Sequence, residues 1–225
     1  MKVIVFGAAG LLGQWTWKAA LEAHHDVTAL VRSPEKLDTA HPLFENLTVI
    51  QGDVMDADTV TAASEGRDVA INCTSPAGGN STLALAKSIV GNAAEAGIDT
   101  FYMVGGLGAL WVPESNQTQL VQDWDDASQM VKYGLPPDIP KENIRAMTKG
   151  HLESMAFMQS TGFAHTFICP GMMLDGPATS SCRITLDEAG GNRMMSVNFG
   201  DVAKVIVDDL GWGKLLGHRV CVSAS

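Results

Sequence analysis

The sequence is poor in cysteine, in aromatic residues and in charge, and each shortage excludes a class of protein. Its four cysteines are widely spaced and form neither a CxxC pair nor a cluster with histidine. That spacing argues against a metal site and a disulfide framework, so we expect reduced, mostly buried thiols. Aromatic residues make up 6%, charged residues 18% and hydrophobic residues 46% of the 225 residues. This composition excludes a disordered, collagenous or coiled-coil chain and favours one globular domain.

Basic residues are scarce as well. Lys and Arg number 15 against 25 Asp and Glu, which gives a formal net charge of −10. An acidic protein repels phosphate backbones, so we expect no nucleic-acid partner. No apolar run reaches the ~20 residues of a membrane span, and the chain begins with a strand pattern instead of an apolar leader. We therefore expect a cytoplasmic protein without a membrane partner, and we leave a homodimer open.

Short apolar runs alternate with helical patterns along the chain. This order predicts an α/β fold with a doubly wound parallel sheet, a Rossmann architecture, in one domain over residues 1–225. The expected strands are Val3–Phe6, Val27–Val31, Leu47–Gln51, Val69–Cys73, Thr100–Val104, Thr166–Cys169 and Arg219–Val222. The expected helices are Leu11–Ala23, a short one from Pro34, Ala57–Ser64, Thr82–Ala96, Glu142–Ser160 and Phe199–Leu210.

The alternation breaks in two places. Several prolines interrupt residues 105–140, where we expect a short helix near Leu120–Lys132, and residues 176–192 are rich in Gly, Ser and Thr, which predicts a loop or short strand. Long excursions in compact domains are usually lids or binding loops. We therefore expect a small C-terminal substrate lobe formed by about 105–140 and 170–200.

A glycine-rich turn follows the first expected strand directly and opens the first expected helix, with the spacing GxxGxxG. In dinucleotide-binding folds the first glycine permits the tight turn, the second lets the backbone approach the pyrophosphate, and the third lets helix and strand pack closely. The free amides at the helix start then face the phosphates. The alternative is a purely structural turn. The residues concerned are Gly7, Ala8, Ala9, Gly10, Leu11, Leu12 and Gly13.

The end of the second expected strand distinguishes NAD from NADP. An acidic residue there would accept hydrogen bonds from the ribose 2′-hydroxyl of NAD. This chain has Arg32 and Ser33 instead, with Lys36 nearby. A guanidinium and a hydroxyl suit the 2′-phosphate, so we expect NADP(H) to be preferred over NAD(H). The alternative is an arginine that is only solvated at the surface.

Two further strand ends should border the cofactor crevice. After the third expected strand, Asp53 either binds the adenine amino group or caps the next helix together with Asp56. The residues after the fourth expected strand should border the ribose near the nicotinamide. The cofactor-binding candidates here are Gly52, Asp53, Val54, Cys73, Thr74 and Ser75.

Taken together, these motifs resemble those of atypical short-chain dehydrogenase/reductases. They are most similar to the NAD(P)H-binding group of NADH-flavin reductases, biliverdin reductase B-like flavin reductases and NmrA-like proteins. Residues 104–110 resemble the glycine-rich segment of this group after the fifth strand, and residues 196–203 resemble its C-terminal pattern. The resemblance implies a Rossmann fold and adds four cofactor contacts, at Gly105, Gly106, Pro170 and Gly171.

The chain departs from the superfamily at its usual acid, a tyrosine in a Tyr-x-x-x-Lys motif. Its only tyrosines, Tyr102 and Tyr133, have no lysine four residues later, and Lys149 is preceded at that distance by Arg145. Glycines also replace the usual serine after the fifth strand. An ordinary carbonyl-reductase mechanism is therefore not expected, and an epimerase of the extended branch is disfavoured.

Flavin reduction fits what remains, because a flavin is itself an electron sink and the protein needs mainly to orient two rings. We expect an NADPH-preferring oxidoreductase that reduces a planar acceptor, a flavin or a quinone-like molecule. The alternative is an NmrA-like sensor that binds NADP without catalysis. His151 is a weak candidate proton donor, or else a buried structural histidine. The expected acceptor-binding residues are Leu107, Trp111, Met172 and Met173.

Overall fold

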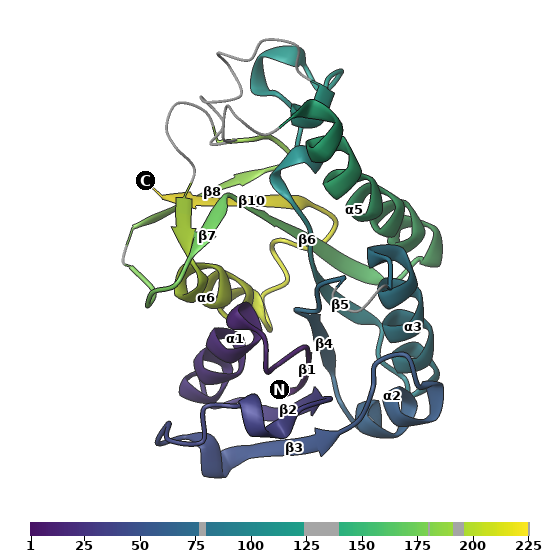
Figure 1. The fold of residues 1–225 in the computed structure, drawn as a ribbon, viewed down its shortest axis with the longest axis vertical. Coiled ribbons are helices and arrows are strands. Elements are labelled where there is room, and N and C mark those ends of the chain that lie inside the picture. Colours follow the sequence, from purple (N-terminus) through teal and green to yellow (C-terminus); the bar gives the residue numbers. More distant parts are fainter. Residues whose placement is uncertain (77–79, 124–139, 180, 191–195, 225) are drawn as a thin grey trace.

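The computed structural model describes residues 1–76, 80–123, 140–179, 181–190 and 196–224. Within them, an eight-stranded sheet runs through the molecule (Figure 1). Its strands are β1 (Lys2–Phe6), β2 (Asp26–Val31), β3 (Leu47–Gln51), β4 (Val69–Asn72), β5 (Thr100–Val104), β6 (Ala164–Pro170), β8 (Cys182–Leu186) and β10 (Arg219–Ala224).

The strand order, β3-β2-β1-β4-β5-β6-β10-β8, confirms the predicted doubly wound fold. Neighbouring strands are parallel except for β10 and β8, which are antiparallel. The chain winds outward from β1 in one direction through β2 and β3, and from β4 onward in the other. Ligands of such sheets bind at the carboxyl ends of the strands where the order reverses, which here is between β1 and β4.

Helices cover both faces of the sheet (Figure 1). On one face, α1 packs against α6, and on the other face α3 packs against both α2 and α5. Each expected helix of the main fold is present, with ends that differ by two residues or fewer. The bounds are α1 Leu11–Glu22, α2 Ala57–Ser64, α3 Thr82–Glu95, α5 Lys141–Thr161 and α6 Phe199–Asp209.

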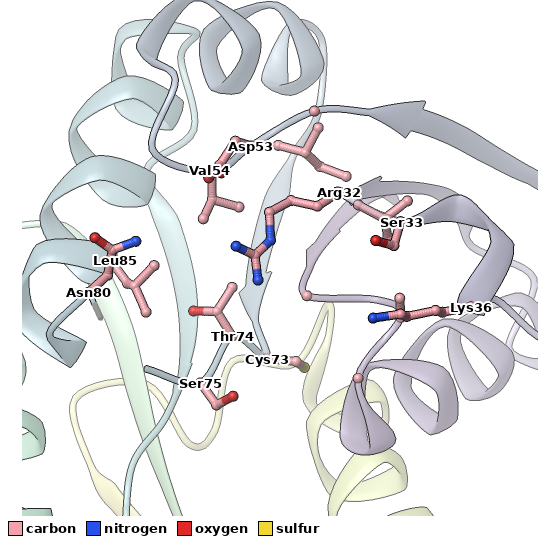
Figure 2. Close-up of a pocket in the computed structure, with 16 residues that line it drawn as sticks. Arg32, Ser33, Lys36, Asp53, Val54, Cys73, Thr74, Ser75, Asn80 and Leu85 are labelled. Carbon is pink, nitrogen blue, oxygen red and sulfur yellow. The ribbon is translucent and has the colours of Figure 1, made fainter. Parts of the chain in front are cut away.

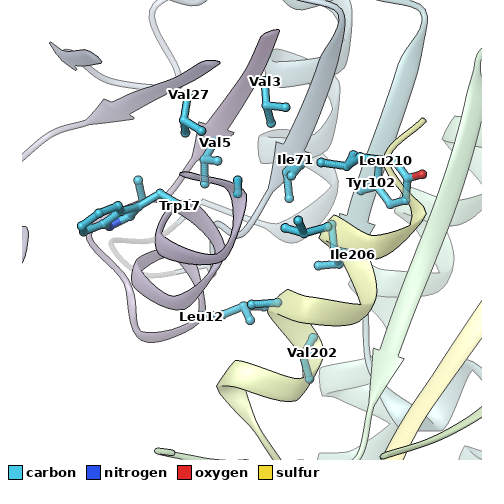
Figure 3. Packing of buried hydrophobic residues seen from close by; sticks show 14 of the residues in the cluster. Val3, Val5, Leu12, Trp17, Val27, Ile71, Tyr102, Val202, Ile206 and Leu210 are labelled. Atoms are coloured by element: carbon cyan, nitrogen blue, oxygen red, sulfur yellow. The ribbon is translucent and has the colours of Figure 1, made fainter. Parts of the chain in front are cut away.

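The core is divided by the sheet into two clusters. Successive side chains of β1 point to opposite faces, so Val3 and Val5 join the cluster under α1 and α6, while Ile4 and Phe6 join the other. All four side chains are fully buried. Figure 3 shows the first cluster, in which Trp17 and other apolar side chains of α1 and α6 meet those of the strands. A strand buried on both faces requires a continuous apolar sequence, as β1 has.

The C-terminal region contains one small sheet that the sequence pattern does not predict, and it decides between the loop and the short strand expected over 176–192. A second, two-stranded parallel sheet joins β7 (Met172–Leu174) to β9 (Ser196–Asn198). The stretch 176–192 contains the edge strand β8. The segment expected from Pro34 is a single 3₁₀ turn, Pro34–Lys36.

Part of the long excursion can be described. Three short 3₁₀ turns occupy its first half, at Leu107–Ala109, Pro113–Ser115 and Val121–Asp123. The expected helix near Leu120–Lys132 lies mostly outside the described residues. Among the helices that the structure describes, none is both long enough and apolar enough to cross a membrane.

Candidate functional site

The three glycines of the turn between β1 and α1 are under different structural constraints. Gly7 has a φ of +76°, a conformation that strongly favours glycine. A Cβ on Gly13 would overlap the backbone of Gly7 and Ala8, so this position must stay bare for the helix to approach the strand. Gly10 has an ordinary extended backbone, with φ −77°, and is exposed. The φ of Gly10 therefore does not require glycine, although a Cβ there would lie 3.2 Å from the Gly7 carbonyl oxygen, and Gly10 lines an open pocket.

The turn forms one wall of a pocket of about 240 Å³ at the carboxyl ends of β1 to β4 (Figure 2). Of the predicted cofactor residues, the pocket brings together Gly7, Ala9, Gly10, Arg32, Ser33, Lys36, Gly52, Asp53, Val54, Cys73, Thr74 and Ser75. Sequence reasoning missed four lining residues. Leu30 and Val31 end β2 and could have been found from the strand pattern. Asn80 lies just before α3 and Leu85 in its first turn, and no motif marks either residue.

One corner of the pocket is cationic. In Figure 2, the Arg32 guanidinium and the Lys36 ammonium both extend into the pocket from the segment that follows β2, which also carries Ser33. Both cationic side chains are exposed. The carbonyl of Arg32 accepts a hydrogen bond from Gln51 Nε2 at 3.4 Å. The residues that directly follow β2 therefore offer two positive charges and a hydroxyl.

Asp53 and Asp56, which follow β3, differ in role: one lines the pocket and the other caps α2. Asp56 is the helix cap, because its side chain accepts the N–H of Thr59 at 3.0 Å. Asp53 accepts the N–H of Met55 at 2.9 Å and lines the pocket. The shared capping role is therefore wrong for Asp53, whose contact with adenine stays a prediction.

The floor of the pocket lies at the end of β4. Thr74 donates its hydroxyl to Asn72 Oδ1 at 2.6 Å, and its backbone N–H donates to the same oxygen at 2.9 Å, which fixes the turn. Cys73 Sγ lies 3.5 Å from Thr16 Oγ1 on α1. Burial raises the pKa of the Cys73 thiol to about 12, so this sulfur stays protonated and unreactive at neutral pH.

Several other predicted cofactor residues do not line the pocket. Ala8, Leu12 and Gly13 are buried beneath the turn, whereas Leu11 points outward and is 62% exposed. Pro170 and Gly171 are buried at the end of β6. Gly105 and Gly106 follow β5, the neighbour of β4 in the sheet, and so lie along the same edge beyond the pocket.

The predicted acceptor residues do not form one open wall. Leu107 belongs to the core under α5 and Met173 packs against the opposite core, so neither forms an open wall. The Trp111 ring is covered by the Arg219 guanidinium, 4.7 Å from the ring centroid. The Trp111 backbone also exchanges hydrogen bonds with Asp187 and Ala189, which gives it a packing role. Met172 alone of the four is largely exposed, at 45%.

His151 lies on α5 beside the strand end at Gly106. A Cβ on Gly106 would come within 2.9 Å of His151 Nδ1, so the missing side chain makes room for the imidazole. Burial lowers the pKa of His151 below its ordinary value, which keeps the ring neutral at pH 7. A neutral imidazole retains one N–H donor. The structure thus places a hydrogen-bond donor near the glycines that follow β5.

Tyr102 cannot replace the missing tyrosine acid. Its side chain is 1% exposed, in the core cluster beneath α1 and α6, and its hydroxyl donates to Asp209 Oδ2 at 2.8 Å. Burial, and then the neighbouring carboxylate, raise the pKa of Tyr102. Tyr133 lies outside the described residues. Lys149 is exposed and faces Glu153 at 3.9 Å.

Metal-binding chemistry finds no support in the described part of the chain. No group of three or more His, Cys, Asp or Glu side chains there could hold a metal ion. The four cysteines are free thiols.

Comparisons with known proteins identify a family and similar folds. A family model described as NAD(P)H-binding matches residues 7–211. The uncharacterized protein YwnB of Bacillus subtilis is 24% identical over 217 residues, which cover 93% of this chain and 92% of that protein. A "putative epimerase" from Bacteroides thetaiotaomicron superposes with a TM-score of 0.79 at 25% identity, covering 99% of this chain and 96% of that one. A "putative NADH-flavin reductase" from Streptococcus pneumoniae gives a TM-score of 0.77 at 22% identity and covers 100% of both chains.

Proposed function

Because the chain belongs to the NAD(P)H-binding family, we propose that it is an NADPH-preferring oxidoreductase that reduces a planar acceptor, either a flavin or a quinone-like molecule. The observation that carries this proposal is the cationic corner of the pocket, where Arg32, Ser33 and Lys36 meet. The open space before Gly10 and the helix start behind it suit a pyrophosphate.

The preference for NADPH rests on charge. The 2′-phosphate distinguishes the two nucleotides, and a guanidinium can bind it with two parallel hydrogen bonds. No carboxylate occupies the position directly after β2, where it would repel that phosphate and bind a free 2′-hydroxyl. Lys36 adds a second positive charge to the same corner of the pocket.

A flavin or quinone acceptor fits the groups near the end of β5. When bound, the nicotinamide supplies a hydride to the acceptor. Such acceptors stabilise the incoming electron pair in their own rings, so the protein does not need the strong acid that carbonyl reduction requires. The glycines at 105 and 106 leave room for a flat ring to approach. The fold likeness to the Streptococcus pneumoniae protein is consistent with this acceptor class.

We assign His151 the role of hydrogen-bond donor to the acceptor. Its neutral ring has one N–H, and its place beside Gly106 lies along the sheet edge that also carries the pocket. The donated hydrogen bond would favour the reduced acceptor, on which negative charge develops.

The test is anaerobic oxidation of NADPH with riboflavin, FMN and menadione as separate acceptors. We expect turnover with at least one acceptor and much slower turnover with NADH at the same subsaturating concentration. A simple aldehyde serves as the control acceptor, which we expect not to be reduced because the tyrosine acid is absent.

A second candidate function, an NmrA-like sensor of the NADP pool, is favoured by the Tyr102 geometry, since the only described tyrosine is sealed in the core. Tight NADPH binding without turnover of any acceptor would select the sensor. Absence of binding to either nucleotide would contradict both candidates.

A further inference from the structure

Gln14, at the start of α1, holds the loop that carries Ser33 and Lys36. Its Nε2 donates to the carbonyl oxygen of Lys36 at 3.1 Å, and its Oε1 accepts the N–H of Asp38 at 3.0 Å. These two peptide groups flank Leu37, whose side chain is 4% exposed and belongs to the core beneath α1. Burial of Leu37 anchors one point of the loop, and the single amide of Gln14 fixes the peptide planes on both sides of that point.

A second side chain of α1 braces the far end of this loop. Lys18 lies one helical turn after Gln14 and therefore on the same face. Its ammonium is 2.6 Å from the Asp38 carboxylate, and this hydrogen bond lowers the pKa of Asp38. Gln14 thus binds the backbone carbonyl of Lys36, whereas Lys18 contacts only the carboxylate of Asp38, two residues later.

We propose that Gln14 is a positioning residue that determines NADPH selectivity through Lys36. The inference rests on the NADPH preference proposed above. Lys36 lines the pocket and Gln14 does not, so Gln14 acts without contacting the cofactor. An exposed lysine samples many rotamers, and the position of its backbone decides how many of them reach the pocket. Fixing that backbone before the nucleotide arrives lowers the entropy lost on binding.

The experiment compares Gln14→Met with Gln159→Met. Methionine has nearly the length of glutamine but offers no amide, and Gln159 is an exposed residue of α5 on which the same change is made. Calorimetry with each variant gives the dissociation constants of NADPH and of NADH. For Gln14→Met we expect NADPH to bind about tenfold more weakly, the factor that 1.4 kcal/mol produces, and NADH to change less than about twofold. Gln159→Met should change neither.

Amide hydrogen exchange gives a readout that needs no cofactor. In Gln14→Met the N–H of Asp38 loses its acceptor, so it should exchange faster, while the N–H of Gln14, bonded to the Gly10 carbonyl at 2.9 Å, should not. If the methionine variant does not fold, Gln14→Asn replaces it, since its amide is one methylene too short to bridge both peptide groups.

Each outcome separates the two proposals. Equal affinity of the wild type for both nucleotides overturns the NADPH preference, and the selectivity role of Gln14 falls with it. A wild type that prefers NADPH, with a Gln14→Met variant of unchanged selectivity, overturns the Gln14 role alone. Equal weakening of NADPH and NADH also overturns it, because Gln14 would then support the whole pocket and not the phosphate corner.

Discussion

Two regions of the proposed cofactor site differ in what fixes their residues: the pocket beside the glycine turn, which we call the adenosine end, and the strand ends beyond β5, which we call the acceptor end. At the adenosine end, local features decide: Gly7 needs its positive φ, and Gly13 needs close contact between α1 and β1. At the acceptor end, the contributing segments are far apart in sequence, and their side chains are placed by packing against α5, β6 and β10. Trp111 illustrates this, because Arg219 of β10 covers its ring. A motif can therefore identify the first end, whereas only a folded chain shows the second.

The largest effect is expected from a side chain added at Gly10, which would block the pyrophosphate. In Gly10→Val the φ of −77° suits valine, and the Cβ, 3.2 Å from the Gly7 carbonyl oxygen, requires only a small local shift. The branched side chain then fills the space before the helix start. We expect NADPH affinity to fall by more than about a hundredfold, because the ligand must lose its backbone contacts at the pyrophosphate, each charged hydrogen bond contributing about 1.5–3 kcal/mol. Calorimetry measures the affinity, and thermal unfolding checks the fold.

The matched substitution Gly13→Val sharpens the same contrast. Its Cβ would overlap the Gly7 carbonyl, so helix and strand would have to separate. We expect this variant to lose stability or fail to fold, whereas Gly10→Val stays folded. Undiminished NADPH affinity in folded Gly10→Val would show that the turn serves the fold alone.

The second largest effect is expected from reversing the charge in the cationic corner of the pocket. Arg32→Asp should invert the nucleotide preference, because a carboxylate repels the 2′-phosphate and accepts the 2′-hydroxyl of NADH. With about 1.5–3 kcal/mol for one charge-assisted bond, the wild type should favour NADPH roughly ten- to a hundredfold. Both side chains of this corner are exposed, so the preference should shrink at high salt.

Dissociation constants for both nucleotides at two salt concentrations test this prediction. Lys36→Met is the companion variant, expected to weaken NADPH without improving NADH. A wild type that binds NADH as tightly as NADPH would return Arg32 to the role of a surface residue.

The third effect concerns the acceptor end. His151→Gln should lower kcat with a planar acceptor about tenfold, well below the ~10²–10⁴-fold of full acid catalysis, and leave NADPH affinity unchanged. Glutamine keeps an N–H donor but holds it elsewhere. A kcat equal to that of the wild type would make His151 a structural residue.

The pH dependence of stability provides a second measurement on His151. Because burial lowers its pKa in the folded protein, the unfolded chain binds the proton first. Stability from this residue is therefore present above the ordinary value of 6.5 and decreases as the pH falls below it. Denaturant unfolding at pH 7.5 and pH 5.5 should show a larger loss for the wild type than for His151→Gln.

How far the sequence could predict the molecule follows the same division. The apolar run Val3–Phe6 is short and ends at a glycine turn, which favours a strand buried on both faces. The turn has a recognisable spacing, so the fold and most of the pocket were predictable. The edge strand β8 has exposed apolar residues at Ile184 and Leu186 with the polar Thr185 between them, a pattern too short to separate from a loop. Its existence depends on pairing with β10, more than 30 residues later in the chain.

Gln14 and Leu107 illustrate what the sequence pattern could not predict. No motif marks Gln14, because its role depends on where the loop at 36–38 returns to α1. Leu107 lies in a glycine-rich segment that suggests an open loop, yet the segment forms a 3₁₀ turn, and a Cβ on Gly108 would overlap Thr148 of α5. In both cases the decisive contact is a tertiary one: for Gln14 the local sequence gives no signal, and for Leu107 it suggests the wrong structure.

The smallest effect on turnover is expected from removing the Tyr102 hydroxyl while keeping its ring. Tyr102→Phe should leave kcat within about twofold of the wild type, because the hydroxyl binds Asp209 in the cluster under α1 and α6, on the far side of the sheet from His151. Stability should still fall, by about 1–3 kcal/mol, since a buried carboxylate oxygen loses a donor. The loss should stay moderate because Asp209 keeps the N–H groups of Lys214 and Leu215. Denaturant unfolding and steady-state kinetics on the same preparation test the stability and the turnover predictions.

A kcat lowered by more than about a hundredfold with intact NADPH binding would contradict this, because that is the scale of general acid catalysis. Tyr102 would then take part in the chemistry, and the acceptor end would lie on the other face of the sheet.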